Sequence, residues 1–236
     1  MANFKLKKGI DIPLKGKPEK KIISIQDQSI LKLHPISIKG IKPKLVVKEG
    51  DQVKTGSVIF LDKILPGVNF VSPATGIIKS IKFGERRVVE EICIDTSGVA
   101  EDFILTKAYT QKDINSLDIS DIKSRLMESG CWPYIRQRPF SKIANPEEIP
   151  KSIFISGFNS APHSLDIETI LNENSDGLQA GINALNKLTD GKIYISVNSN
   201  QQNIVLSNLN GIEINEFSGP HPAGNVGIQI HHIDPI

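Results

Sequence analysis

The sequence predicts a mixed fold in which a small β domain is followed by a parallel α/β domain. Two patterns predict it. Between residues 39 and 94, short β-rich segments alternate with turn residues, which is typical of a small barrel or sandwich. From residue 151 onward, buried-type strands alternate with a helical pattern, which is typical of right-handed parallel βαβ units.

The composition is that of an ordinary globular chain and excludes several classes of protein. The 236 residues include 28 basic and 26 acidic side chains, a balance without the basic stripe of a nucleic-acid-binding protein. Cys93 and Cys131 are too far apart in sequence for a local disulfide, metal or iron–sulfur motif, which fits a reducing compartment. No stretch approaches the roughly 20 apolar residues that cross a bilayer, so a role at a membrane requires a partner already there.

We expect the β domain to occupy residues 1–105, including an N-terminal extension. Its strands are expected near residues 45–47, 53, 58–61, 68–71, 77–78 and 88–94, with turns at 49–51, 55–56, 66–67 and 72–76. The stretches 47–56 and 72–78 resemble the barrel-sandwich hybrid fold of biotinyl and lipoyl carrier domains. Carrier function needs a lysine at an exposed hairpin tip, but the tip here is Pro66-Gly67 and Lys63 precedes it. We therefore expect the fold without the carrier chemistry.

A helical linker is expected at residues 106–150. Ile119, Ile122, Leu126 and Met127 have helical spacing, Ser120 suits the N-cap and Gly130 suits the C′ position. The prolines of residues 131–142 predict irregular structure there, and residues 145–150 are typical of a linker.

A Rossmann-like α/β domain is expected at residues 151–236. Strands are predicted at 153–155, 193–197 and 211–217, and a helix is predicted over 178–188, ending at Thr189-Asp190-Gly191. Residues 227–236 alternate like a strand that has just begun, with no polar tail after it. This predicts a truncated chain that lacks a further C-terminal domain.

Residues 131–142 form the first group of side chains that suits a ligand. Its aromatic and basic members are Trp132, Tyr134, Arg136, Arg138, Phe140 and Lys142. Aromatic faces stack on flat rings and guanidinium groups donate to carbonyl oxygens, which would suit a quinone head group. The alternative is a plug between domains, in which the aromatics fill a gap and the arginines pair with carboxylates.

The second group is the loop at residues 219–227, with three glycines and two prolines. Such a fixed, non-repetitive backbone is typical of a binding site or a contact between subunits, with Gly219, His221 and Gly224 as its candidate residues. His231 and His232 are neighbours on an expected strand and have no paired carboxylate, so no metal site is predicted. Residues 156–160 occupy the position of a phosphate loop after a strand but lack its glycines.

Seven motifs, in order along the chain, resemble one family, the A subunit of the sodium-translocating NADH:quinone reductase (NqrA). They lie at residues 7–18, 48–51, 69–76, 128–132, 138–142, 188–192 and 219–227. Arg-Pro-Phe-Ser-Lys at 138–142 and Gly-Pro-His-Pro-Ala-Gly at 219–224 are specific to the family, whereas the barrel motif alone is not.

The resemblance implies a peripheral protein on the cytoplasmic face of the bacterial inner membrane. It implies no cofactor bound by this chain, with flavins and iron–sulfur centres in the other subunits and quinone as substrate of the complex. It also implies contact with the membrane-embedded B subunit, near which the quinone ring would lie. The quinone-binding candidates that follow are His34, Ile41, Trp132, Tyr134, Arg136, Arg138, Phe140 and Lys142.

Three alternatives remain open at this level. The related C subunit of the Rnf-type ferredoxin-linked complex (RnfC) shares the fold plan, and its cysteine clusters would lie beyond residue 236. A biotinyl or lipoyl carrier module would need only the β domain. An independent nucleotide-binding enzyme would need only the α/β domain.

Overall fold

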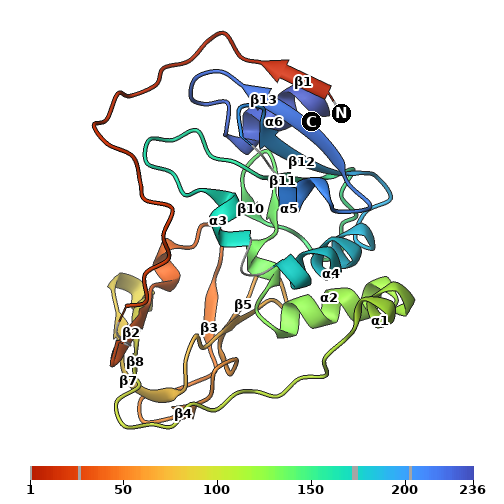
Figure 1. The fold of residues 1–236 in the computed structure, drawn as a ribbon. Helices are drawn as coiled ribbons and strands as arrows, with labels where there is room; N and C mark the ends of the chain where they lie inside the picture. The colour runs from red at the N-terminus through yellow and green to blue at the C-terminus, as the bar shows by residue number, and fades with distance from the viewer. Residues whose placement is uncertain (1, 26–27, 172–174, 202–203) are drawn as a thin grey trace. The chain divides into compact units, whose positions relative to one another are not determined.

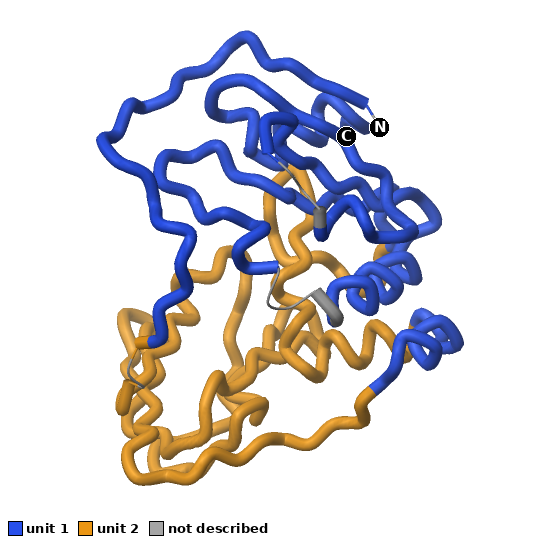
Figure 2. Tube along the Cα trace, in the orientation of Figure 1, with its two compact units in different colours: residues 1–24, 109–119, 149–236 blue, residues 25–108, 120–148 orange. Residues whose placement is uncertain are grey.

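The computed structural model describes residues 2–25, 28–171, 175–201 and 204–236. The chain forms two compact units, each assembled from separate stretches of sequence (Figure 2). Unit 1 comprises residues 1–24, 109–119 and 149–236, and unit 2 comprises residues 25–108 and 120–148. This division differs from the expected one, because the first 24 residues lie with the α/β unit and the expected linker is shared between the units.

Unit 2 contains two small antiparallel sheets that enclose a core. One has the order β2 (Ile30–Leu33), β8 (Val89–Asp95), β7 (Gly76–Phe83), β4 (Gln52–Val53), and the other has the order β3 (Pro43–Leu45), β5 (Val58–Asp62), β6 (Asn69–Val71). Short helical turns occur at η1 (Pro35–Ser37) and η2 (Glu85–Arg87). The core takes Ile59 from the second sheet and Ile78 and Ile92 from the first, all fully buried. The predicted barrel-sandwich hybrid is thereby confirmed.

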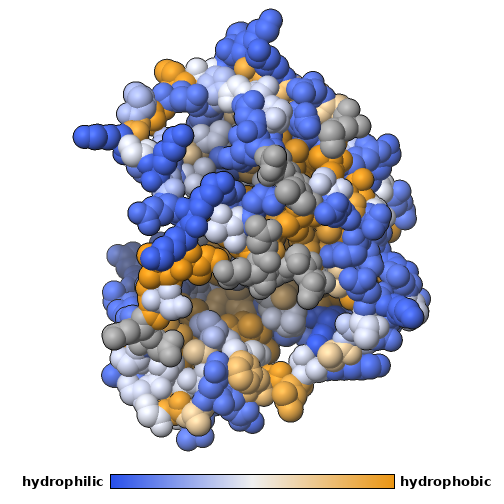
Figure 3. All heavy atoms as spheres, viewed as in Figure 1, coloured by the Kyte–Doolittle hydropathy of each residue, from blue (hydrophilic) through white to orange (hydrophobic). Residues whose placement is uncertain are grey.

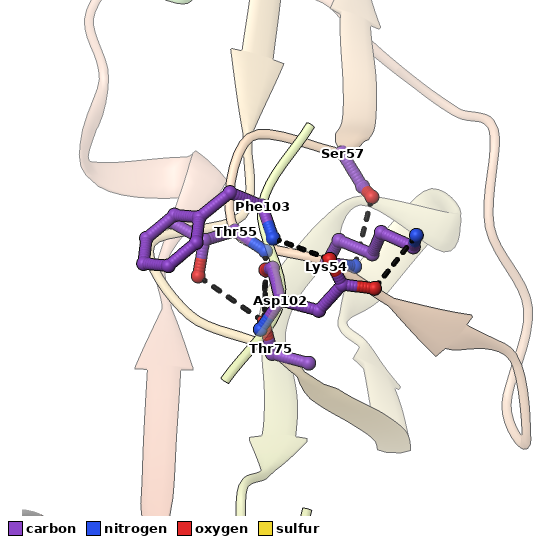
Figure 4. Close-up of polar contacts among 6 residues, drawn as sticks. All are labelled: Lys54, Thr55, Ser57, Thr75, Asp102 and Phe103. Carbon is purple, nitrogen blue, oxygen red and sulfur yellow. Dashed lines mark hydrogen bonds and ion pairs between the residues drawn. The ribbon is translucent and has the colours of Figure 1, made fainter. Parts of the chain in front are cut away.

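A polar cluster fastens the segment after β8 across the barrel (Figure 4). The Thr75 hydroxyl accepts hydrogen bonds from the backbone N–H groups of Thr55, at 3.2 Å, and of Asp102, at 2.9 Å, and donates to the Asp102 carbonyl. Lys54 Nζ lies 2.6 Å from Asp102 Oδ2 and holds the pKa of that carboxyl below its ordinary value. One hydroxyl therefore satisfies the backbone groups of two turns.

Unit 2 continues with α2 (Ile119–Glu128), all but its first residue, and ends in a hairpin. The predicted N-cap at Ser120 is wrong, because the helix already begins at Ile119. Gly130 is left-handed, with φ of +73°, and the Cys131 N–H donates to the Leu126 carbonyl at 3.0 Å, so the expected glycine ending of the helix is confirmed.

The predicted irregular stretch 131–142 contains η3 (Trp132–Tyr134) and an antiparallel hairpin of β9 (Arg136–Gln137) and β10 (Lys142–Ile143). The prediction of irregular structure is wrong because its prolines occupy places that need no N–H donor. Pro133 lies in the first turn of η3, and Pro139 lies in the loop of the hairpin.

Unit 1 is built on a parallel sheet of order β1 (Ala2–Lys5), β13 (Glu213–Ser218), β12 (Ile193–Asn198), β11 (Ile153–Ser156) (Figure 1). Its helices are α1 (Gln111–Ser116), α3 (Ile167–Leu171), α4 (Ser175–Asn186), α5 (Ile204–Ser207) and α6 (Val226–Ile233). Ile182 of α4 packs with Ile193 and Ile195 of β12 in the core of one face. The parallel α/β domain and its three predicted strands are confirmed.

The structure adds a fourth strand at the edge of this sheet. β1 pairs in parallel with β13, and the rings of Phe4 and Phe217 stack with centroids 4.8 Å apart. Four residues with a lysine among them carry too little alternation to predict a strand, so only the fold shows that the N-terminus completes the α/β sheet.

The strand expected to begin in residues 227–236 is wrong, because α6 occupies most of that segment. The Asn225 side chain caps the helix by accepting a hydrogen bond from the Gly227 N–H at 2.9 Å. Val226, Ile230 and Ile233 have helical spacing, so in a helix they lie on one buried or half-buried side. Burial of this side favours the helix over the strand that the alternation of Ile228 and Ile230 had suggested. Within the described ranges, none of the helices has the length and hydropathy that crossing a membrane requires.

Candidate functional site

The hairpin of unit 2 and the helical turn η3 before it each present a large aromatic side chain to solvent. Tyr134 is 84% exposed and Phe140 is 81% exposed, although large apolar surfaces are normally buried. Trp132, in contrast, is 3% exposed, and its Nε1 donates to the Ala144 carbonyl at 2.8 Å. Trp132 is therefore used in packing within unit 2, whereas among the described residues no ring contact involves Tyr134 or Phe140.

The basic residues of the hairpin form no close ion pair with a described carboxylate. Arg136 Nη2 donates to the Ser141 carbonyl at 2.6 Å, which ties the arginine to its own loop. No carboxylate of the described chain forms an ion pair with Arg136, Arg138 or Lys142. Hydrogen bonds from Asn145 and Gln137, together with the positive charge of Lys142, hold the pKa of Glu148 below its ordinary value. The segment thus combines exposed rings with the exposed Arg136 and Lys142 and the half-buried Arg138.

His34 and Ile41, the two candidates expected in segment 34–41, have different surroundings. His34 is exposed, with its Nε2 4.0 Å from Glu91 Oε2, at the entrance to η1. Ile41 packs against the barrel core, so its side chain is used in folding. η1 packs on β8, whereas η3 packs on β6. The structure thus gathers the residues from Tyr134 to Lys142 in η3 and the hairpin that follows it, and among the described residues no hydrogen bond or ion pair joins them to His34 or Ile41.

The β5–β6 hairpin, where a carrier domain would hold its lysine, packs against α2. A Cβ on Gly67 would lie 3.5 Å from the Sδ of Met127, and the Lys63 backbone N–H donates to the Lys42 carbonyl at 2.9 Å. Carrier chemistry needs a tip that a modifying enzyme can reach. Pro66 and Gly67 at this tip are exposed but offer no lysine for attachment, and Lys63 lies before them, which fits a barrel used as a scaffold.

Unit 1 has a pocket at the carboxyl ends of its parallel strands, the usual position of a ligand in such sheets. Its volume is about 430 Å³, and it is lined by Ser156, Phe158, Asn159, Ile167, His221, Gly224, Asn225 and Val226. Two of the three residues predicted from the 219–227 loop, His221 and Gly224, are therefore in its wall, and Gly219 is not. Gly219 instead has φ of +114° and passes close to the Leu6 carbonyl.

A serine from the loop after β11 holds the loop after β13 in place. The Ser160 hydroxyl accepts from the Gly224 N–H at 2.8 Å and lies 3.0 Å from His221 Nδ1. Gly224 must be glycine, because a Cβ would lie 2.2 Å from the Ser160 nitrogen. In the sequence, residues 156–160 were notable only because they occupy the position of a phosphate loop without its glycines. The pairing across some sixty residues has no sequence signal.

The adjacent histidines lie on α6 and not on a strand. His232 Nδ1 lies 3.0 Å from the Ile228 carbonyl, and its ring meets Phe4 edge-on with centroids 6.0 Å apart. His232 is therefore used in packing. Among the residues that the structure describes, no group of three histidine, cysteine or carboxylate side chains could hold a metal ion.

Comparison with known proteins agrees with the fold of each unit, although the matched ranges divide the chain at other residues than the two units do. Residues 4–97 match the model of the NqrA N-terminal barrel-sandwich hybrid domain, and residues 117–236 match that of the NqrA second alpha/beta domain.

Relatives named as the A subunit of the Na(+)-translocating NADH-quinone reductase align with nearly the whole chain. The protein of Yersinia pestis is 38% identical over 99% of this chain and 52% of its own length. Those of Haemophilus influenzae (strain PittGG) and Saccharophagus degradans are each 36% identical, over 98% and 99% of this chain and 51% and 52% of their own lengths. The chain spans about half the length of these relatives. It belongs to the NqrA family, which is the A subunit of the Na(+)-translocating NADH-quinone reductase.

Proposed function

We propose that this chain forms the first two domains of a peripheral subunit of a sodium-pumping NADH:quinone reductase and contributes to quinone binding and assembly. The names of the relatives support the complex, and the matched domains cover both units. Electrons would be carried by flavins and iron–sulfur centres in other subunits. The chain would lie on the cytoplasmic face of the inner membrane against the membrane-embedded B subunit.

The observation that carries the proposal is the exposure of two large aromatic rings, one in η3 and one in the loop of the adjoining hairpin. Tyr134 and Phe140 expose apolar faces, and the basic residues of the same segment form no close ion pair with a described carboxylate. A quinone head group is a flat ring with two carbonyl oxygens, so it would use both kinds of group. A neighbouring protein of the complex that covers the rings would exclude water from the same place.

The role of each side chain follows from this geometry. The aromatic rings of Tyr134 and Phe140 would cover the quinone ring, and Arg138 or Lys142 would stabilise negative charge on a partly reduced oxygen. Arg136 is tied to the Ser141 carbonyl and would position the loop. Trp132 and Ile41 are not retained as contacts, because their side chains are used in packing. His34 remains a weaker candidate.

The test is Phe140→Ala in the assembled complex, with quinone reduction compared with NADH oxidation by an artificial electron acceptor. We expect quinone turnover to fall about tenfold or more while the artificial reaction is kept, because the first electron steps take place in other subunits. Phe83→Ala is the matched control: Phe83 is a 45% exposed phenylalanine of the same unit, beside Arg87. Equal loss of both activities would mean that the hairpin only holds the assembly together.

A further inference from the structure

The segment that follows β1 is pinned to unit 1 at two places. We call residues 6–24 the strap. The Ile10 N–H donates to the His221 carbonyl at 2.9 Å, and the His221 N–H donates to Asp11 Oδ1 at 2.8 Å. Farther along, Lys20 Nζ lies 2.5 Å from Asp166 Oδ2. The strap therefore has a defined course along the edge of unit 1 (Figure 1) and is not a free tail.

The strap concentrates the positive charge of the chain. Its basic residues are Lys7, Lys8, Lys15, Lys17, Lys20 and Lys21, and its acidic residues are Asp11 and Glu19. The rest of the chain has 22 basic and 24 acidic residues, so the net positive charge comes from the strap. Only Lys20 among these lysines forms an ion pair with a described residue. The other five side chains leave their charge to solvent or to a partner.

Large aliphatic side chains are interleaved with these lysines. Ile10 is 74% exposed, Ile12 59% and Leu14 53%, and Ile22 and Ile23 repeat the pattern after the second lysine pair. Figure 3 shows hydrophilic and hydrophobic side chains alternating along the edge that the strap follows in Figure 1. A single exposed isoleucine is ordinary, but a run of them within one basic segment marks an interaction surface.

This combination fits an anionic bilayer surface better than other polyanions. Lysines are attracted by acidic headgroups, aliphatic side chains enter the boundary with the acyl chains, and lysine stems can lie along that boundary with their charges outward. Single-stranded nucleic acid would require aromatic stacking residues, and the strap has none.

We infer that the strap binds anionic phospholipid headgroups and attaches unit 1 to the membrane surface. The inference rests on the proposed function in one respect, that a member of a sodium-pumping complex works at a membrane. It adds a direct contact between this chain and lipid, in addition to any contact with other subunits. An acidic protein surface is the competing occupant, and the experiment separates the two.

The experiment measures co-sedimentation of the chain with vesicles, with none of the other subunits present. We expect binding to mixed phosphatidylglycerol and phosphatidylcholine vesicles, weakening as salt is raised, and little binding to phosphatidylcholine alone. The variant Lys8→Gln, Lys15→Gln, Lys17→Gln and Lys21→Gln should bind more weakly by about fivefold for each lysine removed, equivalent to about 1 kcal/mol each. Ile12→Ser should weaken the binding that remains at high salt.

The matched control removes the same charge from exposed positions outside the strap. Its substitutions are Lys39→Gln, Lys44→Gln, Lys63→Gln and Lys112→Gln, and this variant should retain most of the binding. Equal loss in the two quadruple variants, or equal binding to neutral and anionic vesicles, would overturn the inference. A third result would also overturn the inference: the wild-type chain binds neither kind of vesicle, and the strap variant fails to assemble with the other subunits. That result would assign the strap to a protein partner. Phe140→Ala should bind vesicles normally, so failure of the hairpin proposal and failure of this one are distinguishable.

Discussion

Ser160 Oγ lies 3.0 Å from Nδ1 of His221, and this contact joins the two loops that wall the pocket of unit 1. The same oxygen accepts the Gly224 N–H, so removing it leaves a partly buried donor without its partner. We predict that Ser160→Ala lowers the free energy of unfolding by about 1–3 kcal/mol. Urea denaturation measures it. Ser164→Ala, in the same loop, removes one bond to the Asn159 carbonyl at an exposed site and should cost about 0.5 kcal/mol or less. Equal costs would show that the pocket walls do not depend on Ser160.

Gly130 and Gly98 allow backbone strain to be separated from steric overlap. Both are left-handed, with φ of +73° and +67°, but a Cβ at Gly130 would lie 2.7 Å from Cγ2 of Val71, whereas Gly98 faces open space. Gly98→Ala should therefore cost about 1–2 kcal/mol from strain alone, and Gly130→Ala about 1–3 kcal/mol more. Thermal and urea unfolding of the two variants give the difference. A difference near zero would mean that α2 does not pack closely on β6.

Asp95 should make unfolding of the barrel depend on acid pH. A hydrogen bond from Lys79, followed by bonds from Ser97, lowers its pKa from 3.8 to about 2. A carboxyl whose pKa is lower when folded contributes stability above its unfolded pKa and loses it as the pH falls through the folded pKa. The difference in unfolding free energy between wild type and Asp95→Asn should therefore shrink between about pH 4 and about pH 2. Lys79→Gln should remove most of this dependence, and a difference that is constant with pH would contradict the assignment.

Trp132 and Tyr134 should behave oppositely in the isolated chain. Trp132→Ala empties a site that is 3% exposed and breaks the bond to the Ala144 carbonyl, so it should cost about 3–5 kcal/mol. Tyr134→Ala removes a side chain that is 84% exposed and should change stability by about 0.5 kcal/mol or less. Denaturant unfolding of both variants is the measurement. A large loss at Tyr134 would mean that its ring packs within this chain and is unavailable to a quinone.

The hairpin and the pocket show which site residues can be predicted from the sequence and which cannot. Arg-Pro-Phe-Ser-Lys at 138–142 marked this segment by its resemblance to the family but not its hairpin, and the glycines and prolines of 219–227 identified a fixed loop. Neither pattern separates the buried Trp132 from the exposed Phe140, because burial depends on what packs above each ring. Asn159, Ser160 and Asn225 lie in loops that the sequence analysis considered, but they were not named as site residues, since single polar residues in loops carry no periodic signal.

The sequence by itself determined the two fold classes and most of their strands. Turn residues such as those at 49–51 and 72–76 act locally, and buried strands such as Ile153–Ser156 are recognised by their composition. Only the tertiary structure decided the partners of weak segments. Residues 2–5 became a strand because β13 offered an open edge, and residues 226–233 became a helix because Asn225 capped them and one side of the helix found a core. Local propensity is worth less than about 1 kcal/mol per residue, so contacts between distant segments override it wherever the pattern is short.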